Sequence, residues 1–193
     1  MQLAKFKKLA KDYTAVPVYR RLMADVLTPV SLFLSLRKGA DYPFLLESVE
    51  GGEQVARYSF LGRNPYQVLK YDGEQVSLQQ DDSKTVLERP YFDALKELTT
   101  QHTEPKLPDL PRLTGGAVGF SSYDTVREVE ELGDVPKDDL NIPEAIWAFY
   151  DEVYAFDHVK QQVIIIKTVF VDDKNEKSAE ALFKDAQQSL DDM

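Results

Sequence analysis

The chain has 193 residues, with 23 Lys and Arg against 33 Asp and Glu, which gives a formal net charge of −10. This acidic balance disfavours nucleic acid as a partner, because a polyanion is repelled by a negative surface. Cysteine is absent, which excludes disulfides, thiolate nucleophiles and cysteine-ligated metals. No apolar run approaches the roughly 18 residues that span a bilayer, and the basic N-terminus lacks the apolar segment of a secretory signal. We therefore expect a cytoplasmic protein that does not bind membranes.

Four segments have the pattern of amphipathic helices. In one, Thr28 precedes Pro29, which is a typical helix start because Thr caps free amides and Pro loses no hydrogen bond at the first position. In another, Phe92, Leu95 and Leu98 are expected to share the apolar face. The expected helices cover residues 3–12, 29–36, 90–100 and 178–190.

The other apolar segments alternate with the period of a strand. The pair Asp72-Gly73 favours a tight type I′ turn between two of them. Three glycines, Gly115, Gly116 and Gly119, fall within one strand and indicate close packing against a neighbour. The last two expected strands form the clearest hairpin. The expected strands cover residues 15–23, 44–48, 57–62, 66–71, 74–78, 115–120, 145–156 and 161–170.

The order of these elements predicts the fold class. Strands dominate and follow one another in hairpins rather than in βαβ units, with helices between them. This order is typical of an α+β fold with an antiparallel, sandwich-like β-sheet core and flanking helices. We treat residues 1–193 as one domain, whose candidate internal boundary is the proline-rich segment 101–111.

Residue types alone indicate no catalytic or metal site. The two histidines, His102 and His158, fall in a linker and a hairpin turn, and neither has a second His or an acidic residue at metal-ligand spacing. The acidic residues from Glu128 to Asp139 lack the spacing of a calcium loop and are interpreted as a solvated face. The glycine spacing matches no phosphate-binding or dinucleotide-binding loop. We therefore assign no catalytic residue and no metal ligand.

One local feature points to a ligand. Residues 46–48 end an apolar strand, and residues 57–59 lie on the next strand, across a turn. If the strands pair, their carboxylate, hydroxyl and phenol groups converge on a small zwitterion, while Leu46 and Pro29 face an apolar ring. The same residues also fit an ordinary hairpin whose polar side chains face water. Spacing alone favours this second interpretation.

The same segments resemble anthranilate synthase component I. They include Phe44–Ser48, which is similar to the LLES motif of that family, and Ala56–Gly62, which is similar to its ARYSF motif. Phe120 stands where the family commonly has Tyr. The similarity extends over about residues 13–170, and it is carried by the order and spacing of the motifs more than by any one of them. The matching segments are residues 19–21, 28–33, 44–48, 56–62, 113–124 and 142–158.

The resemblance implies an activity for the complete protein. The family converts chorismate and glutamine-derived ammonia into anthranilate and pyruvate, the first step of tryptophan biosynthesis, so it is a lyase. Its chorismate and Mg²⁺ are bound by a C-terminal chorismate-binding domain that is absent from this chain. The resemblance therefore implies that this chain holds no cofactor and is inactive alone. The implied partners are the C-terminal portion, the glutamine amidotransferase component II, and L-tryptophan as an allosteric feedback inhibitor.

The resemblance also turns the local feature into a tryptophan site. In the family, the LLES segment and its neighbouring strand form the feedback site, which reverses the preference drawn from spacing. Arg57 is the weakest member, because alternation can turn it to the other face. Carried over position by position, the implied tryptophan-binding residues are Pro29, Leu46, Glu47, Ser48, Tyr58, Ser59 and Arg57.

Two alternatives stay open at this point. Component I of aminodeoxychorismate synthase shares the fold and the substrate, and its equivalent pocket can hold tryptophan as a structural ligand. The nearly complete ARYSF motif favours the anthranilate branch. A non-catalytic protein-interaction module without a ligand site is the alternative of another class, and tryptophan would not shift its thermal unfolding.

Overall fold

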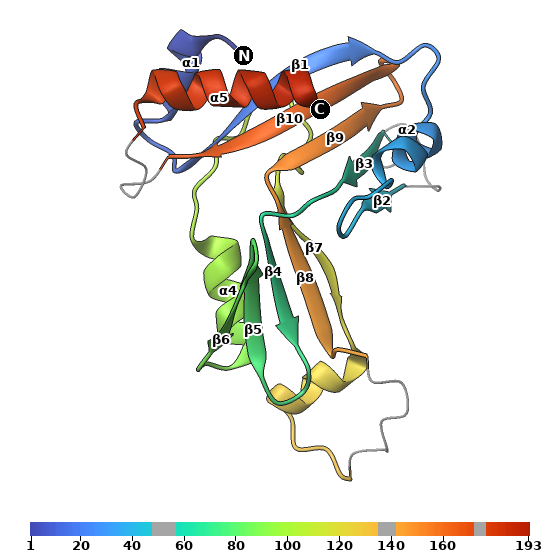
Figure 1. The fold of residues 1–193 in the computed structure, drawn as a ribbon, viewed down its shortest axis with the longest axis vertical. Coiled ribbons are helices and arrows are strands. Elements are labelled where there is room, and N and C mark those ends of the chain that lie inside the picture. The colour runs from blue at the N-terminus through green and yellow to red at the C-terminus, as the bar shows by residue number, and fades with distance from the viewer. Residues whose placement is uncertain (48–56, 135–141, 172–176) are drawn as a thin grey trace. The chain divides into compact units, whose positions relative to one another are not determined.

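The computed structural model describes residues 1–47, 57–134, 142–171 and 177–193 (Figure 1). The chain forms two compact units. Unit 1 comprises residues 1–65, 102–116 and 150–193, and unit 2 comprises residues 66–101 and 117–149. The chain passes between the units after residues 65, 101, 116 and 149, and the second of these points lies at the start of the proline-rich segment.

Unit 1 is built on a five-stranded sheet, sheet A, in the order β1-β10-β9-β3-β2. Each neighbouring pair is antiparallel. The long pairing of β1 with β10 joins two segments rich in apolar residues, and Val163–Ile166 in β10 are buried on both faces of the sheet. The strands are β1 Ala15–Met23, β2 Phe44–Leu46, β3 Tyr58–Gly62, β9 Glu152–Asp157 and β10 Gln162–Phe170.

Three helices pack on one face of sheet A: α1 Leu3–Leu9, α2 Pro29–Leu36 and α5 Ala179–Asp192. Figure 1 shows α5 lying across β10 and β1. Ser178 caps α5 by accepting a hydrogen bond from the amide of Ala181 at 3.3 Å, as expected for a helix N-cap. The main core of unit 1 lies between these helices and the sheet. Its buried members include Phe6, Val16, Val18, Leu36, Leu61, Tyr154, Val163, Ile165, Leu182 and Leu190.

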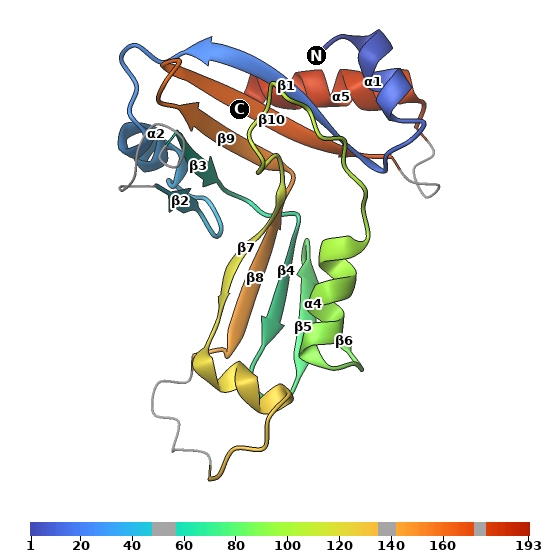
Figure 2. The ribbon, with the colours of Figure 1, turned by 180° about the vertical axis from the view of Figure 1, so that it is seen from behind.

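The opposite face of sheet A has its own smaller core. Ala155, Ile164 and Ile166 are buried there, and Phe60 and Leu110 pack against them. Leu110 belongs to the proline-rich segment, which connects α4 to β7 along the chain. This segment runs along this face of the sheet (Figure 2). The segment is therefore part of the structure of unit 1.

Unit 2 contains a second five-stranded sheet, sheet B, in the order β6-β5-β4-β8-β7. Helix α4 Tyr91–Thr100 packs on it, and the short 3₁₀ helix η1 Tyr123–Glu128 follows β7. Tyr91 is completely buried, and its ring stacks on that of Tyr71 with 5.0 Å between centroids. The strands are β4 Gln67–Tyr71, β5 Val76–Gln80, β6 Ser83–Leu87, β7 Gly116–Ser121 and β8 Ala145–Tyr150.

The expected α+β class with antiparallel sheets and flanking helices is confirmed. One strand assignment was wrong: the segment expected to be a single strand from 145 to 156 divides at Asp151, with β8 in sheet B and β9 in sheet A. The last hairpin therefore consists of β9 and β10 alone. Among the described residues, no helix is long and apolar enough to cross a bilayer.

The turn at Asp72-Gly73 also differs from the expectation. The last pair of the β4–β5 ladder is Tyr71 with Val76, so the loop has four residues and not two. The Asp72 carboxylate accepts hydrogen bonds from the amides of Glu74 and Gln75, at 3.1 and 2.7 Å. Such a side-chain cap stabilises a wider turn, while Gly73 takes the positive φ of +98° that a glycine tolerates.

Candidate functional site

The strands that carry the predicted tryptophan site do pair. β2 and β3 are antiparallel neighbours, and Leu46 lies opposite Phe60. Because side chains alternate between faces along a strand, Leu46, Phe60 and Tyr58 share one face of sheet A. Ser59 lies opposite Phe156 of β9 and points to the other face. Tyr58 and Ser59 therefore point to opposite faces of sheet A, and their convergence on one ligand stays a prediction.

Pro29 lies where the sequence predicts it, at the first position of α2, and it is buried. Thr28 forms a capping box with Ser31: the Thr28 hydroxyl accepts from the Ser31 amide, and the Ser31 hydroxyl accepts from the Thr28 amide, both at 3.0 Å. α2 packs against the face of sheet A that includes Leu45 and Leu61. Pro29 is therefore fixed on the same side of the sheet as Ser59.

The end of β2 is open to solvent. Leu46 is 45% exposed, and Glu47, which follows the strand, is also exposed. β2 is an edge strand among the described strands of sheet A, so one side of its backbone has no partner among them. Ser48 lies outside the described residues.

Arg57 is committed to an ion pair. Its Nε and Nη2 donate to the two carboxylate oxygens of Asp157, at 3.1 and 2.7 Å. The Asp157 side chain is completely buried, and its carboxylate also accepts from the amides of Val159 and Lys160, both at 3.2 Å. Burial would raise the pKa of Asp157, but the hydrogen bonds from Arg57 and from the Lys160 amide hold it below its ordinary value.

Ser59 is 1% exposed, and its hydroxyl lies 2.7 Å from Nε2 of His158, where either group can donate. The His158 amide donates to the carbonyl of Arg57 at 2.9 Å. His158 is exposed, as expected for a turn residue, but its partner was not foreseen. Ser59 lies opposite Phe156 in the β3–β9 register, and His158 follows Phe156 by two positions. Residues two positions apart share a face, so this register brings His158 beside Ser59.

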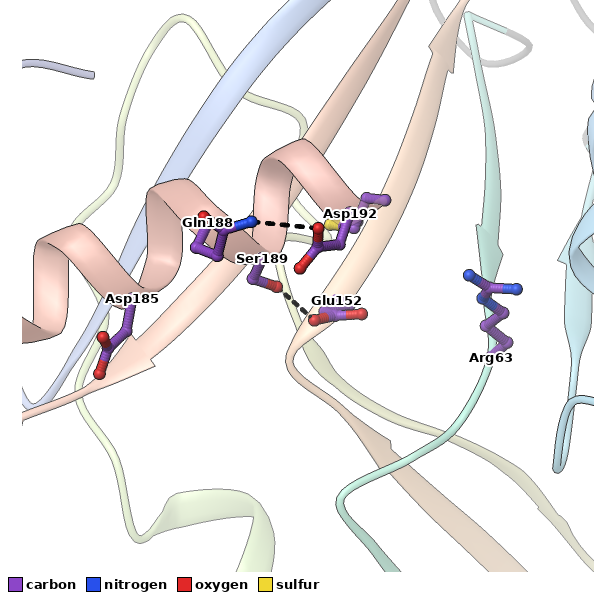
Figure 3. A pocket seen from close by; sticks show the side chains of 7 residues that line it. Arg63, Glu152, Asp185, Gln188, Ser189 and Asp192 are labelled. Carbon is purple, nitrogen blue, oxygen red and sulfur yellow. Dashed lines mark hydrogen bonds between the residues drawn. The ribbon is translucent and has the colours of Figure 1, made fainter.

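Elsewhere in unit 1, described residues line several hollows, among them the following two. The one in Figure 3, of about 410 Å³, has Arg63 on one wall and the last turns of α5 on the other. There, Ser189 donates to Glu152 at 2.6 Å. The second, of about 760 Å³, is lined by residues 104–114, where burial raises the pKa of Glu104. No predicted site residue lines either hollow.

The described part of the chain contains no group of three or more His, Cys, Asp or Glu side chains that could hold a metal ion. The carboxylates that line the hollow in Figure 3 are separated from one another by hydrogen-bonding side chains, and Arg63 lies opposite them. They do not form such a group. The chemistry that the arrangement supports is recognition through an edge strand, an aromatic ring and fixed polar groups.

A family model described as chorismate binding enzyme matches residues 41–192. Anthranilate synthase component 1 of Acetivibrio thermocellus is 40% identical over 177 residues, which cover 91% of this chain and 36% of the relative. The chloroplastic anthranilate synthase alpha subunit 1 of Arabidopsis thaliana is 36% identical over 185 residues, or 86% of this chain and 31% of that protein. The chain thus spans about a third of the length of these relatives.

A solved structure has a similar fold. The crystal structure of anthranilate synthase component I from Streptococcus pneumoniae TIGR4 matches 90% of this chain and 36% of its own chain. The TM-score is 0.56, and 29% of the aligned residues are identical.

Proposed function

We propose that this chain is the N-terminal regulatory portion of an anthranilate synthase component I. The premise is that the chain belongs to the chorismate-binding enzyme family and is homologous to that component over about 90% of its length. The identity of 40% over 177 residues with the Acetivibrio thermocellus protein carries this proposal. The complete component would convert chorismate and ammonia into anthranilate and pyruvate. We propose this activity for the complete component and not for the chain alone.

The regulatory ligand we propose is L-tryptophan. The site lies at the edge of sheet A, where β2 ends, β3 begins and α2 starts. Free backbone groups of an edge strand suit the ammonium and carboxylate of an amino acid, and apolar side chains suit the indole ring. The proposed residues are Pro29, Leu46, Glu47, Ser48, Arg57, Tyr58 and Ser59.

Inhibition would follow from differential affinity. Tryptophan can shift the complete component toward an inactive arrangement only by the difference between its affinities for the two arrangements. We propose that part of the pocket wall comes from the C-terminal portion, which also binds chorismate and Mg²⁺. The isolated chain would then bind tryptophan more weakly than the complete component.

The proposed macromolecular partners are the C-terminal chorismate-binding portion and the glutamine amidotransferase component II. The net charge of −10 supports partners other than nucleic acid. The compartment we propose is the cytoplasm of a cell that makes its own tryptophan, although the plant relative is named as chloroplastic.

Binding can be tested by titrating L-tryptophan into the ¹⁵N-labelled chain and following amide shifts by NMR, which detects millimolar dissociation constants. We expect saturable shifts at residues 45–47 and 57–60, with L-leucine as the control amino acid. Calorimetry with the complete component should give a tighter dissociation constant than the chain. Equal affinities would contradict the shared pocket, and shifts that do not saturate would contradict the site.

Ser48→Phe tests the role of the LLES segment. The larger side chain would fill the proposed pocket, so anthranilate formation by the complete component would no longer be inhibited by tryptophan. Anthranilate fluorescence measures the reaction directly and also separates this branch from aminodeoxychorismate synthesis, which gives a different product. Undiminished inhibition of the Ser48→Phe variant would refute the site assignment.

A further inference from the structure

The start of β3 is tied to the turn between β9 and β10 by four polar residues. We name this group the β3 latch: Arg57, Ser59, Asp157 and His158. Asp157 receives both nitrogens of the Arg57 fork at 3.1 and 2.7 Å. His158 receives or donates a hydrogen bond with the Ser59 hydroxyl at 2.7 Å. Asp157, at the end of β9, thus holds Arg57, which directly precedes β3, and His158 of the turn holds Ser59 of β3.

The latch uses Arg57 and Ser59, two of the three proposed ligand residues at the start of β3, for contacts within the protein. A serine that is 1% exposed and bonded to an imidazole has little surface for a ligand. The Arg57 guanidinium is satisfied by a completely buried carboxylate, and a bidentate pair of this kind has a fixed geometry. While these bonds persist, Arg57 and Ser59 act as anchors of the strand.

Tyr58 lies between the two anchors and points to the opposite face from Ser59. The Arg57 guanidinium carbon lies 4.9 Å from the centre of the Tyr58 ring, within the range of a cation–π contact. Tyr58 also lies 6.0 Å from the ring of Phe60. The Tyr58 ring thus lies against the Arg57 guanidinium, which in turn is held by Asp157.

The latch is not required to pair the strands. Backbone hydrogen bonds already join β3 to β9 over residues 58–61, and a buried hydroxyl next to Phe156 costs free energy unless it is paired. Replacing Ser59 and His158 together by apolar residues can be nearly neutral for stability, because both partners of the hydrogen bond are then removed. The latch thus adds a defined orientation to a pairing that exists without it.

We propose that the β9–β10 turn positions Tyr58 as the residue of β3 that contacts the amino-acid ligand, with Asp157 and His158 as positioning residues and with Arg57 and Ser59 as their anchors. This inference rests on the proposed tryptophan site and changes the roles of its members. Tyr58 supplies the aromatic contact, and His158 joins the residues on which affinity depends although it touches no ligand.

The test uses the 193-residue chain and L-tryptophan, followed by NMR titration. His158→Ala removes the partner of Ser59, and we expect tryptophan to bind about fivefold to tenfold more weakly, the equivalent of one hydrogen bond. His158→Gln keeps a polar group at the reach of Nε2 and should restore affinity to within twofold. Lys160→Gln, on the same turn, changes an exposed side chain outside the latch and should have no effect.

The ring resonances of Tyr58 in the ligand-free chain report the position of this side chain directly. We expect His158→Ala, but not His158→Gln, to shift the Tyr58 ring resonances before any tryptophan is added. If the wild-type chain and the complete component both fail to bind tryptophan, the proposed function itself is wrong. If the wild type binds and His158→Ala binds equally well, the latch inference is overturned. Should His158→Ala not fold, Ser59→Ala takes its place, and unchanged affinity in that variant overturns the inference.

Discussion

Replacing Asp157 by Asn isolates the charge at the centre of the β3 latch. The carboxylate is completely buried and accepts four hydrogen bonds, two from Arg57 and one each from the amides of Val159 and Lys160. Asn has nearly the same shape but only one acceptor oxygen and no charge. The variant therefore keeps the packing and loses the ion pair.

The expected loss follows from the partners that remain. Breaking a buried ion pair costs about 3–5 kcal/mol when the remaining charge stays buried. Here the Arg57 side chain is 35% exposed, so water can solvate it, and the cost falls toward that of the lost charged hydrogen bonds. We expect the free energy of unfolding to decrease by roughly 2 kcal/mol at pH 7.

The same variant should change the response to acid. Burial acts to raise the pKa of Asp157, but the hydrogen bonds from Arg57 and the Lys160 amide hold it below its ordinary value. A carboxylate with a depressed folded-state pKa stabilises the protein fully above its unfolded pKa of about 3.9 and loses that contribution as the pH falls through the folded value. The wild type should therefore lose more stability below pH 4 than Asp157→Asn does.

Urea unfolding followed by circular dichroism at pH 7 and pH 3 measures both effects. Asp25→Asn is the matched control, because Asp25 is an exposed carboxylate of unit 1 and its replacement should change stability by less than about 0.5 kcal/mol. The reasoning fails if Asp157→Asn is as stable as the wild type at pH 7, or if the two proteins have parallel acid profiles.

Two further substitutions test packing and charge elsewhere in the chain. A Cβ on Gly119 would lie 2.0 Å from the carbonyl oxygen of Ile146, whereas one on Gly133 would meet nothing within 4 Å. Gly119→Ala should lower the free energy of unfolding by more than about 2 kcal/mol and so lower the thermal midpoint, whereas Gly133→Ala should not. Equal midpoints of the two variants would refute the close approach of Gly119 to Ile146. Lys167→Met removes the cation 2.7 Å from Asp151, and should cost roughly 2 kcal/mol at pH 7. Burial already raises the pKa of Asp151, so this deficit should shrink as the pH falls and the carboxylate takes up a proton; a constant deficit in chemical denaturation would count against the assignment.

Elements with strong local signals were predicted well from the sequence. β1 has the predicted bounds of residues 15–23, and its Val16, Val18 and Tyr19 are of types that favour strands. α2 begins at Pro29 after the Thr28 cap, as predicted. In both cases the determining interactions lie within a few residues of one another along the chain.

Elements that depend on tertiary contacts were predicted less well. The pattern from Ala145 to Phe156 is continuously apolar, and only the separate sheets to which its halves belong reveal the break at Asp151. β6 was missed, because its side chains are mostly exposed and its two-residue turn, with Asp81 at φ +49°, has no glycine. In α4, the fully buried residue is Tyr91, while Phe92 is 40% exposed; an aromatic at either position satisfies the same amphipathic pattern.

The candidate site shows the same limit. The sequence predicts the two strands correctly, but it groups Tyr58 with Ser59. Neighbouring residues of a strand point to opposite faces of the sheet. The partner of Ser59, His158, lies 99 residues away in the sequence. Such a pair follows from the register of β3 on β9, which is set by the whole of sheet A and not by the residues around either position.

Unit 2 lies entirely between residues 66 and 149, inside the sequence of unit 1, and its two ends meet, since the Tyr66 amide donates to the Phe149 carbonyl at 2.9 Å. This is the arrangement of an inserted domain, whose neighbouring ends allow it to be exchanged between chains with little disturbance. The insertion is not self-contained, because residues 102–116 return to unit 1 and bring Leu110 onto Ile164 and Ile166. A deletion of residues 66–149 would therefore remove Leu110 from the core on one face of sheet A. A chimaera that exchanges unit 2 should therefore keep the proline-rich segment of the same protein that supplies unit 1.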